Sequence, residues 1–209
     1  MAAHAFDLIE TMRFDAVDGF VDLDRHLARM KASAERLGFR FNRHDCRNDL
    51  QAATFRLTRD ARVRLMLSRT GAISIEVGPI PPAPVEPVDV ALVPLPIPPD
   101  DPRLDHKTSD RAWLDDARRG AGTFEIAFVR SDGFVTEGSF TTIFVRRGRR
   151  LVTPPRVSLL PGILRQRLID EGEAIEGEIR PGELADGFFI GNALRGLIPA
   201  RLAATHDSG

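Results

Sequence analysis

The sequence has very little cysteine, since Cys46 is the only one among 209 residues. A lone cysteine excludes an internal disulfide framework and a thiolate metal cluster. The sequence also lacks a metal-ligand spacing such as HExxH, a P-loop, a dinucleotide-binding fingerprint and a Ser-His-Asp arrangement with a nucleophile elbow. We therefore expect no metal site, and any chemistry must come from other residues.

Long apolar runs and an excess of charge are lacking as well. No segment approaches the length of a membrane span, and the N-terminus MAAHAFDLIETMRF contains acidic residues and no continuous apolar run of a signal peptide. The net charge is −1, with arginines and acids interspersed, which excludes the clustered cations of a nucleic-acid binder. We expect a cytoplasmic protein with no membrane or nucleic-acid partner.

Lysine is the scarcest charged residue, because only Lys31 and Lys107 are lysines among 29 basic residues and the rest are arginines. A guanidinium is always charged, whereas a desolvated ammonium can lose its proton and then act as a base or form a Schiff base. One interpretation is that Lys107, in RLDHKTSDRAW, is present because its role needs a deprotonable amine. The other is that an arginine-rich chain has retained two lysines by drift, and composition alone does not decide between them.

Proline is concentrated in one stretch, with ten of the 15 prolines between Pro79 and Pro102. Such a stretch is typical of a connection between domains, interrupted here by one short strand, VDVALVPL. We expect an N-terminal domain over residues 1–93, a linker over 94–102 and a C-terminal domain over 103–209, in an α+β fold. The second half is expected to be a strongly twisted sheet or partial barrel with helices outside it.

Hydrophobic spacing and turn residues predict the individual elements. An aspartate in GFVDLDRH is expected to cap the first helix. In chain order we expect a strand over 6–14, a helix that stops at Gly38, a helix over 47–57, two strands within 62–80 joined by a Thr-Gly turn, a helix over 108–120, three strands within 124–155 separated by Asp-Gly and Arg-Gly turns, a helix over 162–172, and two strands within 186–200 joined by a glycine-rich loop.

Two features could belong to the site of a pyridine cofactor, which needs an acid at its ring nitrogen and an anion site for its phosphate. Glu137, in VTEGS just after the Asp-Gly turn, could be the acid, or it could be a solvated carboxylate at a strand end. Residues 162–164, in LLPGILRQ, open a helix whose unpaired amides favour a phosphate, although most such helix starts bind only water. Both interpretations remain open for each feature.

Other candidates have similar alternatives. The glycines of GNALRG, residues 191–196, would let backbone amides approach an oxyanion, or they form a simple tight turn. Arg29 lies on the apolar side of a helix, where it either needs a buried anion such as a phosphate or extends to the surface. We expect His26 to be a capping or core histidine and His106 to be a packing residue.

Seven segments occur in an order that resembles a known family: FDLIETMR, DLDRHLARMKASAERLGF, RVRLMLS, HKTSDR, DGFVTEGSFTTIFV, TPPRVSLLPGILRQ and NALRGLIPA. Together they are similar to the class IV aminotransferase family of pyridoxal-phosphate enzymes. The resemblance runs from about Phe6 to Ala200, and the order of the segments favours the functional interpretation of Lys107. Within the family, the HKT site and the Asn-x-x-Arg-Gly loop look most like those of 4-amino-4-deoxychorismate lyases.

The resemblance implies a role for each candidate. Lys107 would be the catalytic residue and hold pyridoxal 5'-phosphate covalently, and Glu137 would face the pyridine nitrogen. Arg29 would bind the phosphate, while Leu194 and Arg195 would face the substrate, with Arg195 pairing with its carboxylates. Phosphate binding would be completed by the backbone amides of Ile163, Leu164, Asn192 and Ala193. Leu164 stands where the family often has threonine, and Thr142 where asparagine is common.

The same resemblance implies a fold-type IV architecture like that of branched-chain aminotransferases, with a small α/β domain, a larger pseudo-barrel domain, the cofactor between them and a homodimer. A small-molecule amino substrate would undergo one of two reactions, which share their first steps. The lyase reaction eliminates pyruvate and leaves 4-aminobenzoate, whereas the aminotransferase reaction, of branched-chain or D-amino-acid type, yields a keto acid. A homologue that binds the cofactor without turnover is the third possibility.

Overall fold

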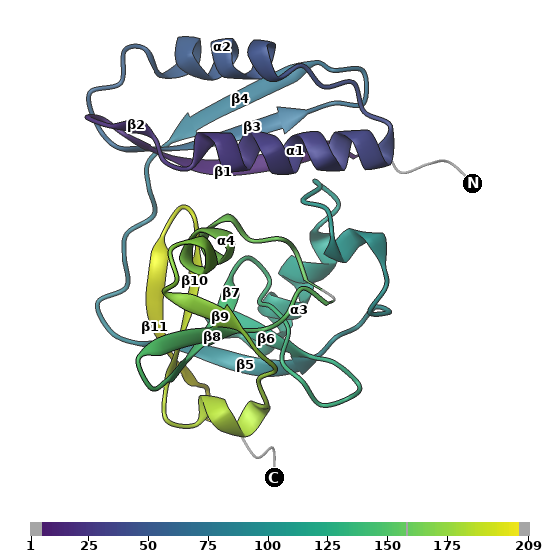
Figure 1. Ribbon diagram of the computed structural model, residues 1–209, viewed down its shortest axis with the longest axis vertical. Coiled ribbons are helices and arrows are strands. Elements are labelled where there is room, and N and C mark those ends of the chain that lie inside the picture. Colours follow the sequence, from purple (N-terminus) through teal and green to yellow (C-terminus); the bar gives the residue numbers. More distant parts are fainter. Residues whose placement is uncertain (1–5, 158, 205–209) are drawn as a thin grey trace. The chain divides into compact units, whose positions relative to one another are not determined.

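The chain forms two compact units in the computed structural model, which describes residues 6–157 and 159–204 (Figure 1). Of the described residues, 6–82 and 105–111 form the first unit, and 83–104, 112–157 and 159–204 form the second. Each unit contains a buried apolar cluster of its own. The described residues include no helix that is both long and apolar enough to cross a bilayer.

These units divide the chain differently from the expected boundary after residue 93. Strand β5 (Val88–Pro94) pairs in parallel with β6 (Glu125–Val129), so it belongs to the second unit. Residues 105–111 return to the first unit, where Thr108 bridges to Leu8. The proline-rich stretch does contain the first passage between the units. Composition, however, does not show which sheet a strand joins.

The first unit is a four-stranded antiparallel sheet, in the order β2-β1-β3-β4, with two helices alongside it (Figure 1). Along β3, every second residue is buried, and these residues pack with apolar residues of the helices. The elements are β1 (Leu8–Asp15), β2 (Gly19–Phe20), α1 (Leu23–Leu37), α2 (Arg43–Thr54), β3 (Ala61–Leu67) and β4 (Ile73–Gly78).

The second unit is a seven-stranded mixed sheet, in the order β6-β5-β11-β10-β7-β8-β9. Residues 134–137 join its edge strand to a central one, because Val135 bridges to Val129 at the end of β6 and Glu137 bridges to Thr142 at the start of β7. The sheet therefore curls back on itself as a partial barrel. Its other elements are η1 (Pro102–Leu104), α3 (Ala112–Ala121), β7 (Thr142–Arg147), β8 (Arg150–Thr153), α4 (Ile163–Asp170), β9 (Ala174–Glu176), η2 (Pro181–Leu184), β10 (Phe188–Asn192) and β11 (Gly196–Leu202).

Most of the expected elements are confirmed, including the end of α1 at Gly38, which adopts a left-handed φ of 70°. Several helix starts differ. Asp22 precedes α1, but its side chain makes no capping hydrogen bond. Helix α2 starts earlier than expected because the Asn42 side chain accepts from the amides of His44 and Asp45. Helix α3 starts later than expected, since Thr108 bridges to Leu8 at the start of β1 and the Ser109 amide donates to the Asp7 carbonyl just before it.

Candidate active site

Lys107 lies on the segment 105–111 that returns to the first unit. The Ile9 amide donates to the Lys107 carbonyl (2.9 Å), and the Ser109 amide donates to the Asp7 carbonyl (2.8 Å). The Asp7 amide in turn donates to the Ser109 hydroxyl (2.9 Å). Hydrogen bonds at the Lys107 carbonyl and at Ser109 therefore fix this backbone beside the start of β1.

The surroundings of Lys107 disfavour its ammonium form. Burial, followed by the positive charges of Arg111 and Arg29, lowers the pKa of Lys107 well below its ordinary value, and the opposing effect of Glu10 is smaller. Lys31, by contrast, is exposed and lies 3.4 Å from Glu35 in an ion pair. The lowered pKa of Lys107 favours the neutral amine, which is the nucleophilic form of a lysine. This favours the functional interpretation of Lys107 over that of a lysine left by drift.

Arg29 is held in place by Glu10, a buried carboxylate on strand β1. Its Nε donates to Glu10 Oε1 (2.8 Å) and its Nη2 donates to Glu10 Oε2 (2.6 Å). His26 Nδ1 also lies 2.7 Å from Glu10 Oε2. Burial raises the pKa of Glu10, but the charge of Arg29 and the hydrogen bond from His26 outweigh it, and the pKa falls to about 2. Glu10 thus remains an anion that orients the Arg29 guanidinium.

The two histidines have structural partners. His26 is buried, as expected for a core histidine, and its Nε2 has no hydrogen-bond partner among the described residues. His106, beside Lys107, lies with Nδ1 at 3.0 Å from the Ser33 hydroxyl. Neither contact indicates a catalytic role.

In the second unit, Glu137 lies where residues 134–137 close the partial barrel. The Phe128 amide donates to its carbonyl (2.9 Å), and the Leu160 amide donates to its Oε1 (3.1 Å). The side chain is half-buried. It is therefore held at a defined place and is not a freely solvated carboxylate at a strand end.

Helix α4 begins at Ile163 without a side-chain cap, so the amides of its first turn are available to an anion. Leu164 is buried and packs in the core, which leaves only its backbone for a ligand. A Cβ on Gly162 would lie 2.7 Å from the Thr142 hydroxyl oxygen, so that hydroxyl lies directly against the start of the helix. Thr142 is only 6% exposed, and no side-chain hydrogen bond of it is found among the described residues.

The loop between β10 and β11 is ordered by Asn192. Its Oδ1 accepts from the amides of Leu194 (3.1 Å) and Arg195 (3.0 Å), and its Nδ2 donates to the Phe140 carbonyl (3.2 Å). Because this side chain is engaged in the turn, only backbone groups at Asn192 and Ala193 remain for a phosphate. Leu194, expected to face a substrate, is buried.

Arg195, the other residue expected to face a substrate, is half-buried, and its guanidinium lies 5.8 Å from the centroid of the Phe124 ring. Burial lowers the pKa of Arg195 from its ordinary value. A partly desolvated guanidinium binds a carboxylate more strongly than a solvated one does. Arg195 thus has the properties of an anion-binding side chain.

The structure gathers the expected residues in two groups. Lys107 and Arg29 lie in the first unit around Glu10, whereas Glu137, the start of α4 and the loop 191–196 lie in the second. Sequence reasoning missed two buried carboxylates, Glu10 and Glu125. A usable signal existed, because Glu10 has the same strand parity as the buried Leu8 and Met12, and Glu125 is the only charge in FEIAFV.

Comparison with known proteins identifies the family. The model of the family described as "Amino-transferase class IV" matches residues 7–203, nearly the whole chain. The chain belongs to the class IV aminotransferases. It is therefore an enzyme of a family whose lyases and aminotransferases depend on pyridoxal phosphate. This confirms the resemblance stated for the seven segments.

Two relatives and one further solved structure are similar to this chain over most of its length. A Schizosaccharomyces pombe protein named "Putative aminodeoxychorismate lyase" is 29% identical over 180 residues, which cover 82% of this chain and 77% of the relative. A crystal structure from Mesorhizobium loti, named "Putative amino-acid aminotransferase", has a TM-score of 0.87 and 35% identity, and covers 95% of this chain and 100% of its own. The expected fold is thereby confirmed.

The further structure is a Mycobacterium tuberculosis protein, a "hypothetical aminotransferase" with α-ketoglutarate and PMP bound. It has a TM-score of 0.83 and 22% identity, and covers 96% of this chain and 82% of its own. At this identity the likeness shows the shared fold alone.

Proposed function

We propose that the protein is a pyridoxal-phosphate-dependent 4-amino-4-deoxychorismate lyase, which releases pyruvate and 4-aminobenzoate. The observation that carries the proposal is Lys107, one of two lysines, whose environment disfavours the ammonium form. The similarity to the Schizosaccharomyces pombe protein supports the choice of substrate.

The residues present fit the proposed cofactor, because each of its functional groups has a chemically matched partner. A neutral Lys107 Nζ is able to condense with an aldehyde, and the Glu137 carboxylate would keep a pyridine nitrogen protonated. Arg29 would bind the phosphate dianion as a cation that Glu10 already holds in place. Further phosphate donors would be the amides of Ile163, Leu164, Asn192 and Ala193, and the Thr142 hydroxyl would supply the side-chain donor that Leu164 lacks.

When bound, the cofactor supplies an electron sink for negative charge that develops on the substrate carbon. The chain's own residues would do the rest. Lys107, whose backbone is held beside β1, would use the neutral form of its Nζ to accept the proton from the substrate carbon that bears the amine. Arg195 would fix the substrate by pairing with its carboxylates, and Leu194 would line the same side.

The deciding experiment is an assay of pyruvate release from 4-amino-4-deoxychorismate with no keto acid present. We expect pyruvate and 4-aminobenzoate in equal amounts from wild type and neither product from Lys107→Ala. Lys31→Ala serves as the matched control, because it removes the chain's other lysine and should retain activity. Failure of the wild type to release pyruvate would overturn the lyase assignment.

An amino-acid aminotransferase is the second candidate, favoured by the 35% identity to the Mesorhizobium loti protein. In that case product would form only after a keto-acid acceptor is added, and amino groups would appear on the acceptor. A protein that binds the cofactor but performs neither reaction would be the inactive homologue.

We also propose that the protein acts as a homodimer, which size-exclusion chromatography with light scattering would test.

A further inference from the structure

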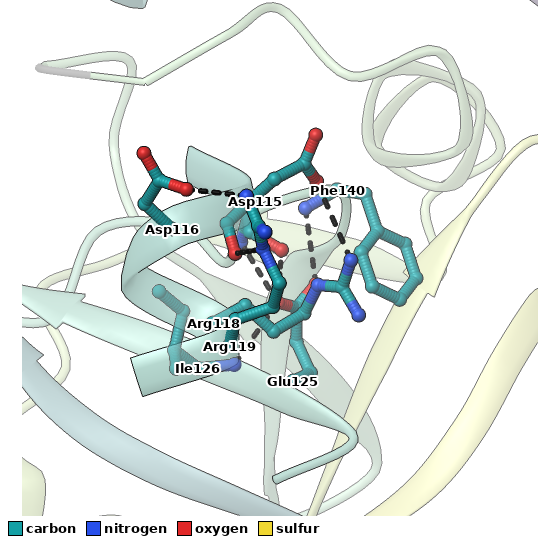
Figure 2. A network of polar contacts seen from close by, with 8 residues as sticks. Asp115, Asp116, Arg118, Arg119, Glu125, Ile126 and Phe140 are labelled. Atoms are coloured by element: carbon teal, nitrogen blue, oxygen red, sulfur yellow. Dashed lines mark hydrogen bonds and ion pairs between the residues drawn. The ribbon is translucent and has the colours of Figure 1, made fainter. Parts of the chain in front are cut away.

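Glu125 is a fully buried carboxylate of the second unit, and no part of the proposed chemistry uses it. It lies at the start of β6 with 0% exposure. Figure 2 shows it with two of its partners, Ile126 and Phe140. Five hydrogen bonds reach its two oxygens, from Ile126 N (2.9 Å), Ser139 N (2.9 Å), Ser139 Oγ (2.6 Å), Phe140 N (3.0 Å) and Thr141 Oγ1 (2.9 Å).

All five donors are neutral, and four of them belong to the turn 138–141. Glu125 forms no ion pair with any described residue. Arg118, drawn in the same view, lies instead over the Phe140 ring, 5.5 Å from its centroid (Figure 2). The turn therefore folds around an anion without a countercharge, and its backbone and hydroxyl dipoles balance that charge.

Gly138 shows how closely the turn surrounds the carboxylate. A Cβ at this position would lie 2.8 Å from Glu125 Oε2 and 2.7 Å from Thr141 Oγ1. The Gly138 amide donates to the Thr141 carbonyl (2.8 Å), which closes the turn. Position 138 therefore requires glycine, because any side chain there would displace the turn 138–141 from Glu125.

The turn 138–141 connects two parts of the proposed site in this unit, Glu137 and the loop 192–195. On one side it continues directly into Glu137, whose carbonyl accepts from Phe128 on the same strand as Glu125. On the other side the Phe140 carbonyl accepts from Asn192, which in turn orders the amides of Leu194 and Arg195. The turn, held by its hydrogen bonds to Glu125, is thus joined to Glu137 through the backbone and to the loop 192–195 through the hydrogen bond from Asn192.

We propose that Glu125 is a positioning residue that holds the turn 138–141 and thereby sets both Glu137 and the loop 192–195. The proposal deepens the proposed function and rests on it, since Glu137 and Arg195 are its cofactor and substrate residues. Glu125 would touch neither ligand. It would act only through the turn.

The test is amide hydrogen exchange of the cofactor-free protein, followed by a titration with pyridoxal phosphate. In Glu125→Gln one of the two acceptor oxygens is replaced by an NH2 group, which cannot accept a hydrogen bond from the turn. We therefore expect amide exchange at 138–141 and at 192–195 to accelerate by about tenfold or more. Exchange within the first unit should be unchanged. The affinity for pyridoxal phosphate should fall by about tenfold, because Glu137 and the loop 192–195 would no longer be held in position.

Asp116→Asn is the matched control, because Asp116 is a carboxylate of the same unit that is 65% exposed and pairs with Arg119 (Figure 2). It should leave exchange and affinity unchanged. Should Glu125→Gln fail to fold, Ser139→Ala removes a single hydroxyl donor and should accelerate exchange of both segments to a smaller degree.

Three results would overturn the proposal. They are unchanged exchange at 138–141, faster exchange there with 192–195 unaffected, and an equal acceleration throughout the second unit, as expected of a residue that only stabilises the fold. If wild type binds no pyridoxal phosphate, the proposed function fails, but the exchange experiment still decides whether Glu125 positions both segments.

Discussion

The two units stabilise a buried carboxylate with different kinds of partner. Each buries a carboxylate on a strand, Glu10 on β1 and Glu125 on β6, with 1% and 0% exposure. Glu10 is balanced by the charge of Arg29 and by His26. Glu125 is balanced by neutral amides and hydroxyls of one turn.

The difference teaches what each carboxylate can be used for. A carboxylate paired with a cation fixes that cation, so Glu10 leaves Arg29 oriented as a binding group. A carboxylate surrounded by dipoles fixes the backbone that supplies them, so Glu125 determines the path of the chain around Glu137. The first arrangement should depend strongly on charge and the second on the geometry of its donors.

The largest effect is expected from Glu10→Gln. It removes the countercharge of Arg29, whose side chain is only 10% exposed, and we expect the free energy of unfolding to fall by about 3–5 kcal/mol. Urea unfolding of the intact chain measures this. Glu35→Gln, at an exposed position, is the control and should change stability by less than about 0.5 kcal/mol. A loss at Glu10 no greater than that at Glu35 would remove the distinction between the units.

Acid should expose the charge dependence of the first unit. Because the pKa of Glu10 is lowered from 4.5 to about 2, its contribution is complete above pH 4.5 and is lost as the pH falls through 2. We expect it to amount to roughly 3 kcal/mol. Unfolding measured between pH 5 and pH 2 should show a steeper loss in wild type than in Glu10→Gln, and parallel curves would contradict the assignment.

Lys107 should change stability with pH in the same direction as Glu10, but over a higher pH range and by removal of a cost. Its pKa is lowered in the folded protein, so the unfolded chain binds the extra proton and stability rises as the pH approaches 10.5, its ordinary value. Lys107→Met removes that cost, so the cofactor-free variant should be more stable than wild type at pH 7. Thermal unfolding should show this advantage shrinking as the pH is raised. A destabilised variant at pH 7 would count against a disfavoured ammonium.

A smaller effect on stability is expected from Glu125→Gln, in spite of its five hydrogen bonds. The carboxamide keeps one acceptor oxygen and leaves no cation unpaired, so we expect a loss of about 2 kcal/mol. Urea unfolding beside Glu10→Gln tests the order of the two. If Glu125→Gln cost more than Glu10→Gln, neutral donors rather than charge would dominate the energetics of burial here.

The smallest effect is expected from Lys31→Ala, which breaks an exposed ion pair to Glu35. The Lys31 and Glu35 side chains are 56% and 66% exposed, and such pairs contribute about 0.5 kcal/mol or less. Thermal unfolding should hardly distinguish this variant from wild type. A clear loss of stability would mean that Lys31 has a role that its exposure does not reveal.

Local sequence signals predicted the elements better than the contacts between them. Gly38 after an apolar helix face and the Thr-Gly turn before β4 are local features, and the structure confirms both elements. The middle strand expected within 124–155 is instead broken by the turn 138–141. Gly138 and Ser139 are a local turn signal, but they do not show that the turn surrounds the carboxylate of Glu125 on another strand.

The candidate site shows the same limit. The rarity of lysine marked Lys107, and the family resemblance marked Arg29 and Glu137. The partners that hold Arg29 and the turn after Glu137, however, lie 19 and 14 residues away along the chain. Strand parity could have flagged Glu10 as buried and the apolar run FEIAFV could have flagged Glu125, but neither signal shows what these carboxylates bind.

The central claim is that Lys107 is the amine that holds the cofactor, and covalent trapping tests it most directly. The purified protein is incubated with pyridoxal phosphate, reduced with borohydride and digested, and the modified peptide is identified by mass spectrometry. The account predicts a reduced pyridoxyl group on the peptide that contains Lys107 and an unmodified Lys31. Modification of Lys31 instead, or of neither lysine, would contradict it.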